Sequence, residues 1–184
     1  MNKNTFSCAK CLLVVILLIL AGILGFVYSG WYPIGADNKH HALTYWALET
    51  LRERSIARAS ADISVPGDLD SPERLLAGGP DYHEMCSGCH LQPAKAQSDF
   101  TLGLYPAPPN LTEAKSGQIS TTENQRTFWI IKHGIKASGM PSWAPGHDDE
   151  RIWSMVAFIN RLPELSASEY QILTSRTDDN GHAH

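Results

Sequence analysis

Hydrophobic residues are concentrated near the N-terminal end of the chain. After a polar segment, residues 1–10, an uncharged run of 18 residues begins at Cys11. An α-helix rises 1.5 Å per residue, so about 20 apolar residues cross the hydrocarbon core of a membrane. The pattern predicts a transmembrane anchor over residues 11–32. Trp31 and Tyr32 would then lie at the membrane–water interface, where amphipathic aromatic rings settle.

A cleaved signal peptide is the alternative interpretation of this run. The apolar region of a signal peptide is usually about 7–15 residues long and is followed by a small-x-small cleavage site. The run here is longer and no Ala-x-Ala sequence follows it, which favours a retained anchor. Lys3 and Lys10 precede the run, so the bias of basic residues predicts a cytoplasmic N-terminus and places the remainder of the chain outside.

The remainder of the chain shows the spacing of helices, and we expect no strands. Apolar residues at helical spacing predict helices over residues 37–57, 72–85, 121–132 and 148–162. Stretches rich in Gly and Pro predict a linker over 64–70 and loops over 99–112 and 137–145. The predicted fold class is all-α, with an N-terminal transmembrane helix and a helical domain. We divide the chain into a cytoplasmic N-terminus (1–10), the anchor (11–32), an amphipathic helix with its linker (33–71), the helical domain (72–165) and a C-terminal tail (166–184).

The helix predicted over residues 37–57 has an apolar side and a charged side, and Asp37 is its expected N-cap. The residues that recur at helical spacing on the apolar side are Leu43, Trp46, Ala47, Thr50 and Leu51, and those of the charged side are Glu49, Arg52, Glu53 and Arg54. Two interpretations of this helix are open. It packs on its own domain or lies near the membrane, or it is a docking surface for a partner protein. Amphipathic helices are common, which favours the first interpretation.

Composition narrows the classes of function. The chain is 43% hydrophobic and its net charge is −4, without a long run of like charges, so we expect no nucleic-acid binding. No nucleophile–base pair stands out. We therefore predict no catalytic residue, no small-molecule substrate and no enzyme activity of the chain itself.

The four cysteines form two C-x-x-C pairs, and only the second is followed by histidine. Cys86-Ser87-Gly88-Cys89-His90 is a C-x-x-C-H sequence, the pattern of a c-type haem attachment site. Two thiols three residues apart on a helical turn reach the two vinyl groups of one porphyrin, and the next residue brings an imidazole to the iron. Ser87 and Gly88 are small, which lets the backbone lie close to the ring.

Two structural alternatives to haem attachment are weaker. A zinc site needs a second pair of ligands, and the only other cysteines, Cys8 and Cys11, lie at the N-terminal border of the membrane segment, on its opposite side. A thioredoxin-like dithiol expects a βαβ context, which the pattern does not predict. Cys8 and Cys11 are expected to be reduced thiols on the cytoplasmic side.

Residues 72–162 resemble the class I monohaem cytochromes c, specifically the bacterial membrane-anchored ones. The resemblance rests on the haem motif together with Pro109-Asn110-Leu111, Ile131-Lys132-His133-Gly134-Ile135 and Gly139-Met140-Pro141. It also rests on the four-residue spacing of Gly78, Tyr82 and Cys86, which is similar to the family's first helix. One departure is Gly79-Pro80 inside that helix, where proline would kink the helix or start it afresh.

The resemblance implies a cofactor and a set of ligands. One haem c would be bound covalently by Cys86 and Cys89, with His90 as one axial ligand of the iron. The Pro109 carbonyl would accept a hydrogen bond from the imidazole N–H and orient it. The first helix would cross the last one, with Gly78 allowing Trp153 or a neighbour to approach closely.

Met140 is the candidate for the second axial ligand. It follows His90 by 50 residues, in a loop that can fold over the opposite haem face. A thioether is a soft ligand that favours ferrous iron. Met85 adjoins the attachment site, and Met155 is expected in the core of the last helix. His147 is a further rival, but His133, close to Met140, is the serious one. The Gly-Met-Pro context and ligand softness favour Met140. Three large aromatics, Tyr105, Trp129 and Trp143, are expected near the haem, either as core or with one of them bonding a propionate.

The predicted function is single-electron transfer, as a carrier or as a subunit of a respiratory complex. The alternative is a haem-based gas or redox sensor whose sixth ligand is displaceable. The expected location is the bacterial cytoplasmic membrane with the haem domain in the periplasm, and the expected partners are that membrane and redox proteins, with residues 37–57 as a potential docking segment. The Asp- and His-containing tail, residues 178–184, is expected to be disordered rather than a metal site.

Overall fold

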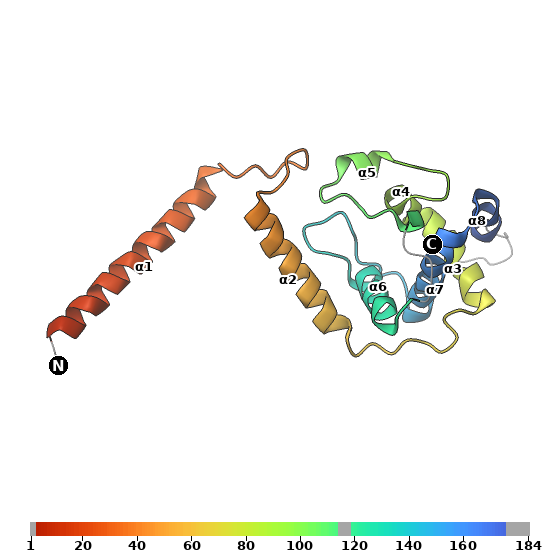
Figure 1. Cartoon of the computed structure of the whole chain (residues 1–184), viewed down its shortest axis with the longest axis horizontal. Coiled ribbons are helices and arrows are strands. Elements are labelled where there is room, and N and C mark those ends of the chain that lie inside the picture. Colours follow the sequence, from red (N-terminus) through yellow and green to blue (C-terminus); the bar gives the residue numbers. More distant parts are fainter. Residues whose placement is uncertain (1–2, 114–118, 176–184) are drawn as a thin grey trace. The chain divides into compact units, whose positions relative to one another are not determined.

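The structure, a computed structural model, describes residues 3–113 and 119–175, and for residues 3–8 the backbone alone. Within this part of the chain every regular element is a helix, so the all-α fold class is confirmed (Figure 1). The elements are α1 (Lys3–Ser29), α2 (Ala42–Ser60), α3 (Pro72–Met85), α4 (Ser87–His90), α5 (Asp99–Gly103), the 3₁₀ turn η1 (Leu111–Glu113), α6 (Thr121–His133), α7 (Asp149–Arg161), the 3₁₀ turn η2 (Leu162–Glu164) and α8 (Ala167–Thr174).

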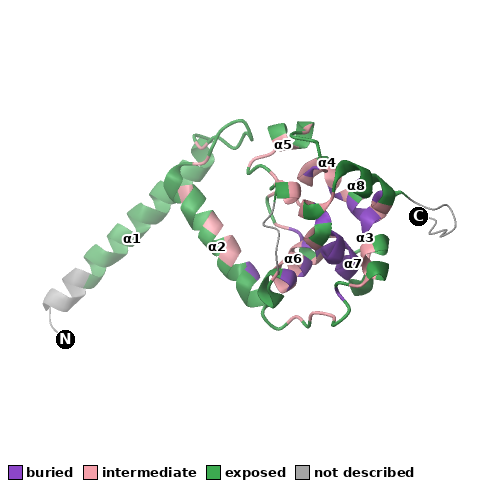
Figure 2. Cartoon of the chain, turned by 45° about the vertical axis from the view of Figure 1, so that its right-hand side comes forward, coloured by how far each residue is buried: buried purple, intermediate pink, exposed green. Residues whose placement is uncertain are grey.

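The chain divides into two compact units after Asn38, and α1 forms the first. Its segment Ala9–Ser29 has a mean hydropathy of 3.0 and no buried residues, so it is long and apolar enough to cross a membrane. Figure 2 shows α1 exposed along the whole of its coloured length. The helix ends at Ser29, so Trp31 and Tyr32 follow it in the chain. The first unit therefore has the features of a membrane anchor.

The second unit is built on the crossing of α3 and α7, which lie side by side (Figure 1). At the crossing Gly78 meets the backbone of Ser154, and a Cβ on Gly78 would overlap the Ser154 carbonyl oxygen. Only glycine permits an approach this close. The predicted close approach at Gly78 is confirmed, and the neighbour it admits is the backbone of Ser154 rather than the side chain of Trp153.

The next residue of α3 makes a second close contact, with α8. A Cβ on Gly79 would overlap the carbonyl oxygen of Leu173. Around this contact lies a buried cluster in which apolar rings pack together, formed by Tyr82, Cys86, Phe158, Leu162 and Tyr170. The helix continues through Pro80 to Met85, so it does not start afresh at the proline.

Side-chain pairs fix α7 against its neighbours. Arg151 on α7 donates two hydrogen bonds to the buried carboxylate of Asp81 on α3, at 2.6 and 2.8 Å. The rings of Phe128 on α6 and Trp153 on α7 stack with their centroids 4.1 Å apart. A bidentate Arg–carboxylate pair sets orientation as well as distance. Figure 2 shows α7 as the most continuously buried helix, as expected for the central element of the core.

Helix α2 belongs to this second unit and packs on α6. Ile56 and Ser60 of α2 are each 2% exposed, and Arg126 of α6 holds both carboxylate oxygens of Glu53 at 2.9 Å. Gln125 of α6 donates to the Ile63 carbonyl at 2.8 Å, which ties the segment after α2 to the same helix. The prediction that this segment packs on its own domain is confirmed for one face of α2.

Two local predictions are wrong. Asp37 does not cap α2, because it lies in a turn in which Asn38 N–H donates to Gly35 O, and the helix begins later, after His41. The loop expected over residues 99–112 contains α5 and η1. Ser98 and Thr101 form a capping box there that stabilises a short helix. The loop expected over residues 137–145 is confirmed. The tail, residues 178–184, lies outside the described residues.

The close α3–α7 crossing predicts that replacing each of two glycines by alanine has very different effects on stability. Gly78→Ala should lower the free energy of unfolding by ~2 kcal/mol, since overpacking at a rigid backbone contact outweighs the better helix propensity of alanine. Gly67→Ala is the control, because a Cβ on Gly67 meets nothing within 4 Å. Urea unfolding of both variants in mild detergent measures this, and equal stabilities would contradict the proposed role of the crossing.

Candidate haem site

The C-x-x-C-H sequence forms one tight turn at the end of α3. Cys86 closes α3 and opens α4, and its carbonyl oxygen accepts hydrogen bonds from the N–H groups of Cys89 at 3.0 Å and His90 at 2.8 Å. The turn therefore collects both thiols and the imidazole within one helical turn. This local geometry follows from sequence spacing, and the α3–α7 crossing fixes where the turn lies.

The residue after the turn is held by the hydroxyl of Tyr82. Leu91 has a φ of 69°, a conformation that side-chain-bearing residues rarely adopt. The buried Tyr82 hydroxyl donates to the Leu91 carbonyl at 2.7 Å. Burial raises the pKa of Tyr82 far above its usual range, so the hydroxyl stays a donor. Sequence reasoning found Tyr82 as a packing residue and missed this hydrogen bond.

Cys86 and Cys89 are free thiols and do not bond to one another. Cys86 is 6% exposed and Cys89 is half-buried. Burial, with smaller contributions from Asp81 and Cys89, raises the pKa of Cys86 to about 12, and burial also raises the pKa of Cys89. Burial therefore favours the protonated thiol over the thiolate at both cysteines.

His90 and Pro109 come together from opposite ends of the segment that contains α5. Nδ1 of His90 lies 2.9 Å from the Pro109 carbonyl oxygen, and because a carbonyl only accepts, Nδ1 carries the proton. Burial lowers the pKa of His90, and the bond to Pro109 opposes that effect. The ring is therefore a neutral imidazole that presents Nε2 as its lone-pair nitrogen, the form that ligates a metal.

Helix α5 packs on the attachment turn, a contact that sequence reasoning missed. Ser98 donates its hydroxyl proton to the Gly88 carbonyl at 2.6 Å, and the Phe100 ring lies 3.7 Å from where a Gly88 Cβ would be. The Ser98–Thr101 capping box was the sequence signal for this helix. Since α5 lies between His90 and Pro109 in the chain, this contact helps to return Pro109 to the histidine.

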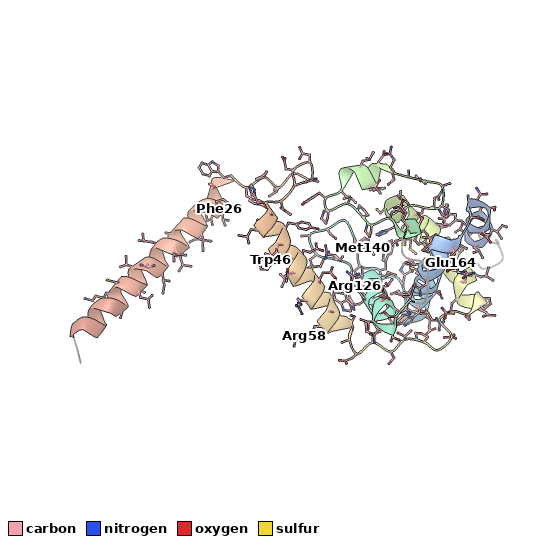
Figure 3. The ribbon with its side chains drawn as sticks, viewed as in Figure 1. Phe26, Trp46, Arg58, Arg126, Met140 and Glu164 are labelled. Atoms are coloured by element: carbon pink, nitrogen blue, oxygen red, sulfur yellow. The ribbon has the colours of Figure 1, made fainter. Side chains whose placement is uncertain are left out.

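Met140 lies in the loop between α6 and α7, labelled in Figure 3. The loop folds back on itself and on α6. Ile135 N–H donates to the Met140 carbonyl at 3.1 Å, and Trp143 N–H donates to the Ile131 carbonyl at 3.2 Å. Gly134 starts the loop with a φ of 65° and leaves no room for a Cβ beside Pro141. The Met140 side chain is half-buried and packs against the core of α6 and α7.

Comparison with known proteins supports the same chemistry. Residues 73–159 match the family described as cytochrome c oxidase, cbb3-type, subunit III. Residues 73–159 are a c-type cytochrome domain. No curated protein and no solved structure matches the chain. The match includes the attachment turn, Pro109 and the Met140 loop, and it leaves out α1 and α2.

The side chains of the cytochrome domain suit a haem. Two reduced thiols, one imidazole with its Nε2 left for a metal, and one thioether are the donors that a covalently bound haem takes from a protein. Bound haem iron supplies a ferric–ferrous couple that carries one electron. The activity of the domain is haem-based electron transfer.

The four residues that rival Met140 as the second ligand of the iron lie in different surroundings. Met155 is fully buried in the core of α7, and Met85 packs between the two core clusters. His133 is exposed at the end of α6, with its ring 5.0 Å from Trp129. Nδ1 of His147 donates to the Trp143 carbonyl oxygen at 3.1 Å, and its Nε2 is buried without a partner in the described part of the chain.

The three aromatics predicted near the haem each contact a histidine. Trp129 contacts His133 and Trp143 contacts His147, while the half-buried Tyr105 packs edge-on against His40, with ring centroids 5.4 Å apart. The contact with His40 joins the segment before α2 to the loop that leads to Pro109. A propionate contact for any of the three stays a prediction.

The Tyr82–Leu91 hydrogen bond predicts the effect of removing one hydroxyl. Tyr82→Phe should lower the free energy of unfolding by ~1–2 kcal/mol, because the buried Leu91 carbonyl loses its donor while the ring packing stays. Tyr45→Phe is the matched control. The Tyr45 hydroxyl also makes a hydrogen bond, with Glu49, but Tyr45 is 42% exposed. Thermal unfolding of both variants would contradict the role of Tyr82 if the two stabilities were equal.

Proposed function

We propose that the chain is a membrane-anchored c-type cytochrome that passes single electrons through one haem. Cys86 and Cys89 bind that haem covalently, and His90 and Met140 are its axial ligands. The His90–Pro109 hydrogen bond beside two reduced thiols on one turn carries this proposal, because it fixes the tautomer that an iron ligand needs. The sequence contains one C-x-x-C-H motif, which supports one haem per chain.

The proposed ligands come from two separately held segments. The attachment turn is fixed by the α3–α7 crossing, and the Met140 loop is fixed to the end of α6 by backbone hydrogen bonds. With protein groups at both axial positions the iron has no open site, and rigid ligands keep the rearrangement on each electron transfer small. A thioether ligand raises the reduction potential. These features support a carrier rather than an enzyme acting on a substrate.

The proposed location is the bacterial cytoplasmic membrane. The Ala9–Ser29 segment is the anchor, with residues 1–10 in the cytoplasm and the haem domain, residues 72–165, in the periplasm. The basic residues Lys3 and Lys10 support that orientation. Haem attachment to C-x-x-C-H proteins of the resembled bacterial family takes place outside this membrane, which supports it independently.

The proposed partners are redox proteins of a membrane-bound oxidase complex, since the matched family is described as an oxidase subunit. Between residues 72 and 164 there are 8 Lys and Arg against 10 Asp and Glu, a net charge of −2 (8 − 10). Strong electrostatic steering of a diffusing partner is therefore not expected. Anchoring in the membrane takes the place of steering, because it raises the effective concentration of the haem domain near its membrane partners. Of residues 37–57, only the face of α2 that points away from α6 is left for a partner or for lipid.

Methionine ligation predicts the response of the protein to carbon monoxide. The reduced wild-type protein should show a low-spin spectrum that carbon monoxide leaves unchanged, because both axial sites are filled. Met140→Leu should open one site, bind carbon monoxide and lose the methionine–iron band of the oxidised form. Absorption spectra of the detergent-solubilised proteins measure this.

Met85→Leu is the matched control, since it removes a partly buried sulfur from the neighbouring core. It should keep the wild-type spectra. Unchanged spectra in Met140→Leu would contradict ligation by Met140 and would point to His133 or His147. A wild-type spectrum that shifts at once with carbon monoxide would instead favour the sensor function.

Covalent attachment predicts different outcomes for the two cysteine pairs. Replacing Cys86 and Cys89 by serine should leave no haem bound to the denatured chain, because both thioether bonds are lost. Cys11→Ser should keep one covalent haem, as Cys11 is an exposed thiol of α1. Intact mass spectrometry and the pyridine haemochrome spectrum report both results. Covalent haem on the double variant, or its loss in Cys11→Ser, would contradict the assignment.

A further inference from the structure

The face of α2 opposite α6 is exposed and amphipathic along its length. We define the outer face of α2 by the residues Leu43, Ala47, Leu51, Arg54 and Arg58. With 3.6 residues per turn, Ala47, Arg54 and Arg58 lie about half a turn from the buried Ile56, and Leu43 and Leu51 lie close beside them. Trp46 and Arg58 are labelled on α2 in Figure 3, and Arg126 is labelled on α6.

The first half of the outer face is apolar although it is exposed. Leu43 and Leu51 are 74% and 68% exposed, and Ala47, one turn from each of them, is exposed as well. They are not needed for the core, because α2 is held to α6 through its opposite side. A cluster of large exposed apolar side chains on one helix marks a surface that contacts something else.

The charges of α2 are segregated between its two faces. Both carboxylates are engaged by arginines: Glu49 binds Arg52 at 2.7 Å, and Glu53 binds Arg52 and Arg126 at 3.0 and 2.9 Å. Arg54 and Arg58 are exposed on the outer face and have no ion-pair partner within the described residues. The outer face therefore offers apolar groups and positive charge without acidic groups of its own.

The position of α2 in the chain limits what this face can reach. The apolar helix ends at Ser29 and α2 begins at Ala42, so 12 residues, 30–41, connect them. A chain extends by at most ~3.5 Å per residue, which keeps α2 within ~40 Å of the end of the membrane span. Trp31, exposed just after that span, is a residue type that favours the lipid headgroup region.

We propose that the outer face of α2 lies on the anionic lipid surface of the membrane that holds α1. Leu43, Ala47 and Leu51 enter the headgroup boundary, and Arg54 and Arg58 contact lipid phosphates, as in helices that lie in the membrane interface. Because α2 is fixed to α6, this contact sets the orientation of the cytochrome domain on the membrane. The proposal rests on the anchoring by α1 proposed above.

Spin labels on the full-length haem-loaded protein in lipid nanodiscs test the contact. Leu43→Cys and Leu51→Cys report on the outer face, in a background with Cys8→Ser and Cys11→Ser. Ile172→Cys on α8 is the matched control, since Ile172 is 71% exposed and apolar but lies on another element. The readout is the ratio of the label's accessibility to oxygen and to a water-soluble nickel complex. Each accessibility is a difference with and without relaxant, so the constant effect of the haem iron cancels.

In nanodiscs of phosphatidylcholine with about a quarter phosphatidylglycerol, labels at 43 and 51 should have a ratio several-fold higher than the label at 172. Arg54→Gln together with Arg58→Gln should lower the ratio at 51 toward its value in phosphatidylcholine alone. Lys95→Gln removes one exposed charge elsewhere and should leave the ratio unchanged.

Three results would overturn the proposal. Labels at 43 and 51 that are as accessible to nickel as the label at 172, in a chain that co-purifies with the nanodiscs, would leave the face to a protein partner. A raised ratio at all three positions would indicate non-specific adsorption of the domain. A chain that does not enter nanodiscs at all would refute the proposal that α1 is a membrane anchor. The proposed contact of α2 with the lipid surface would then fail as well.

Discussion

The contact between Gly78 and the Ser154 backbone determines how closely α3 and α7 pack, and the rest of the cytochrome domain depends on it. A Cβ at that point would separate the helices. The turn that bears both thiols begins at Cys86, directly after the last residue of α3, so any shift of α3 moves Cys86, Cys89 and His90 together. The buried Asp81–Arg151 pair fixes the rotation of the same two helices. The packing of α3 on α7 therefore determines the geometry of the candidate site.

The site is assembled from three segments with separate supports. The attachment turn is supported by α3 and by the Tyr82 hydroxyl, Pro109 is returned to His90 by the segment that contains α5, and Met140 is held by backbone hydrogen bonds to α6. None of these supports needs a charged group beside the imidazole. The surroundings are apolar enough to lower the pKa of His90 and to raise that of both thiols. Such an environment suits a buried cofactor with protein ligands on both faces.

Helix α2 extends the domain beyond the part that matches the cytochrome family. On its inner side both carboxylates form ion pairs with arginines. On its outer side two arginines lie beside exposed apolar residues. This division of charge is visible only once the packed side is known. From the sequence alone, Glu49, Arg52, Glu53 and Arg54 read as one charged side, whereas the structure places Arg54 away from the other three. Asp37 does not cap α2, because it lies in a separate turn where its carboxylate accepts a hydrogen bond from the Asn38 amide at 3.2 Å.

The sequence by itself determined whatever depends on neighbours within a few residues. The apolar run, the spacing of the thiols and histidine, and the bounds of α3, α6 and α7 to within a residue or so follow from local periodicity and motif chemistry. Tertiary structure decided which glycine meets which backbone, that α5 packs on the attachment turn, and which side of α2 faces α6. Those outcomes depend on packing between segments far apart in the chain, whose energies no local pattern contains. The 2.9 Å contact of His90 with Pro109 depends on sequence and tertiary structure together. The resemblance in sequence suggested the pair, and the fold of the segment between them brings the two atoms together.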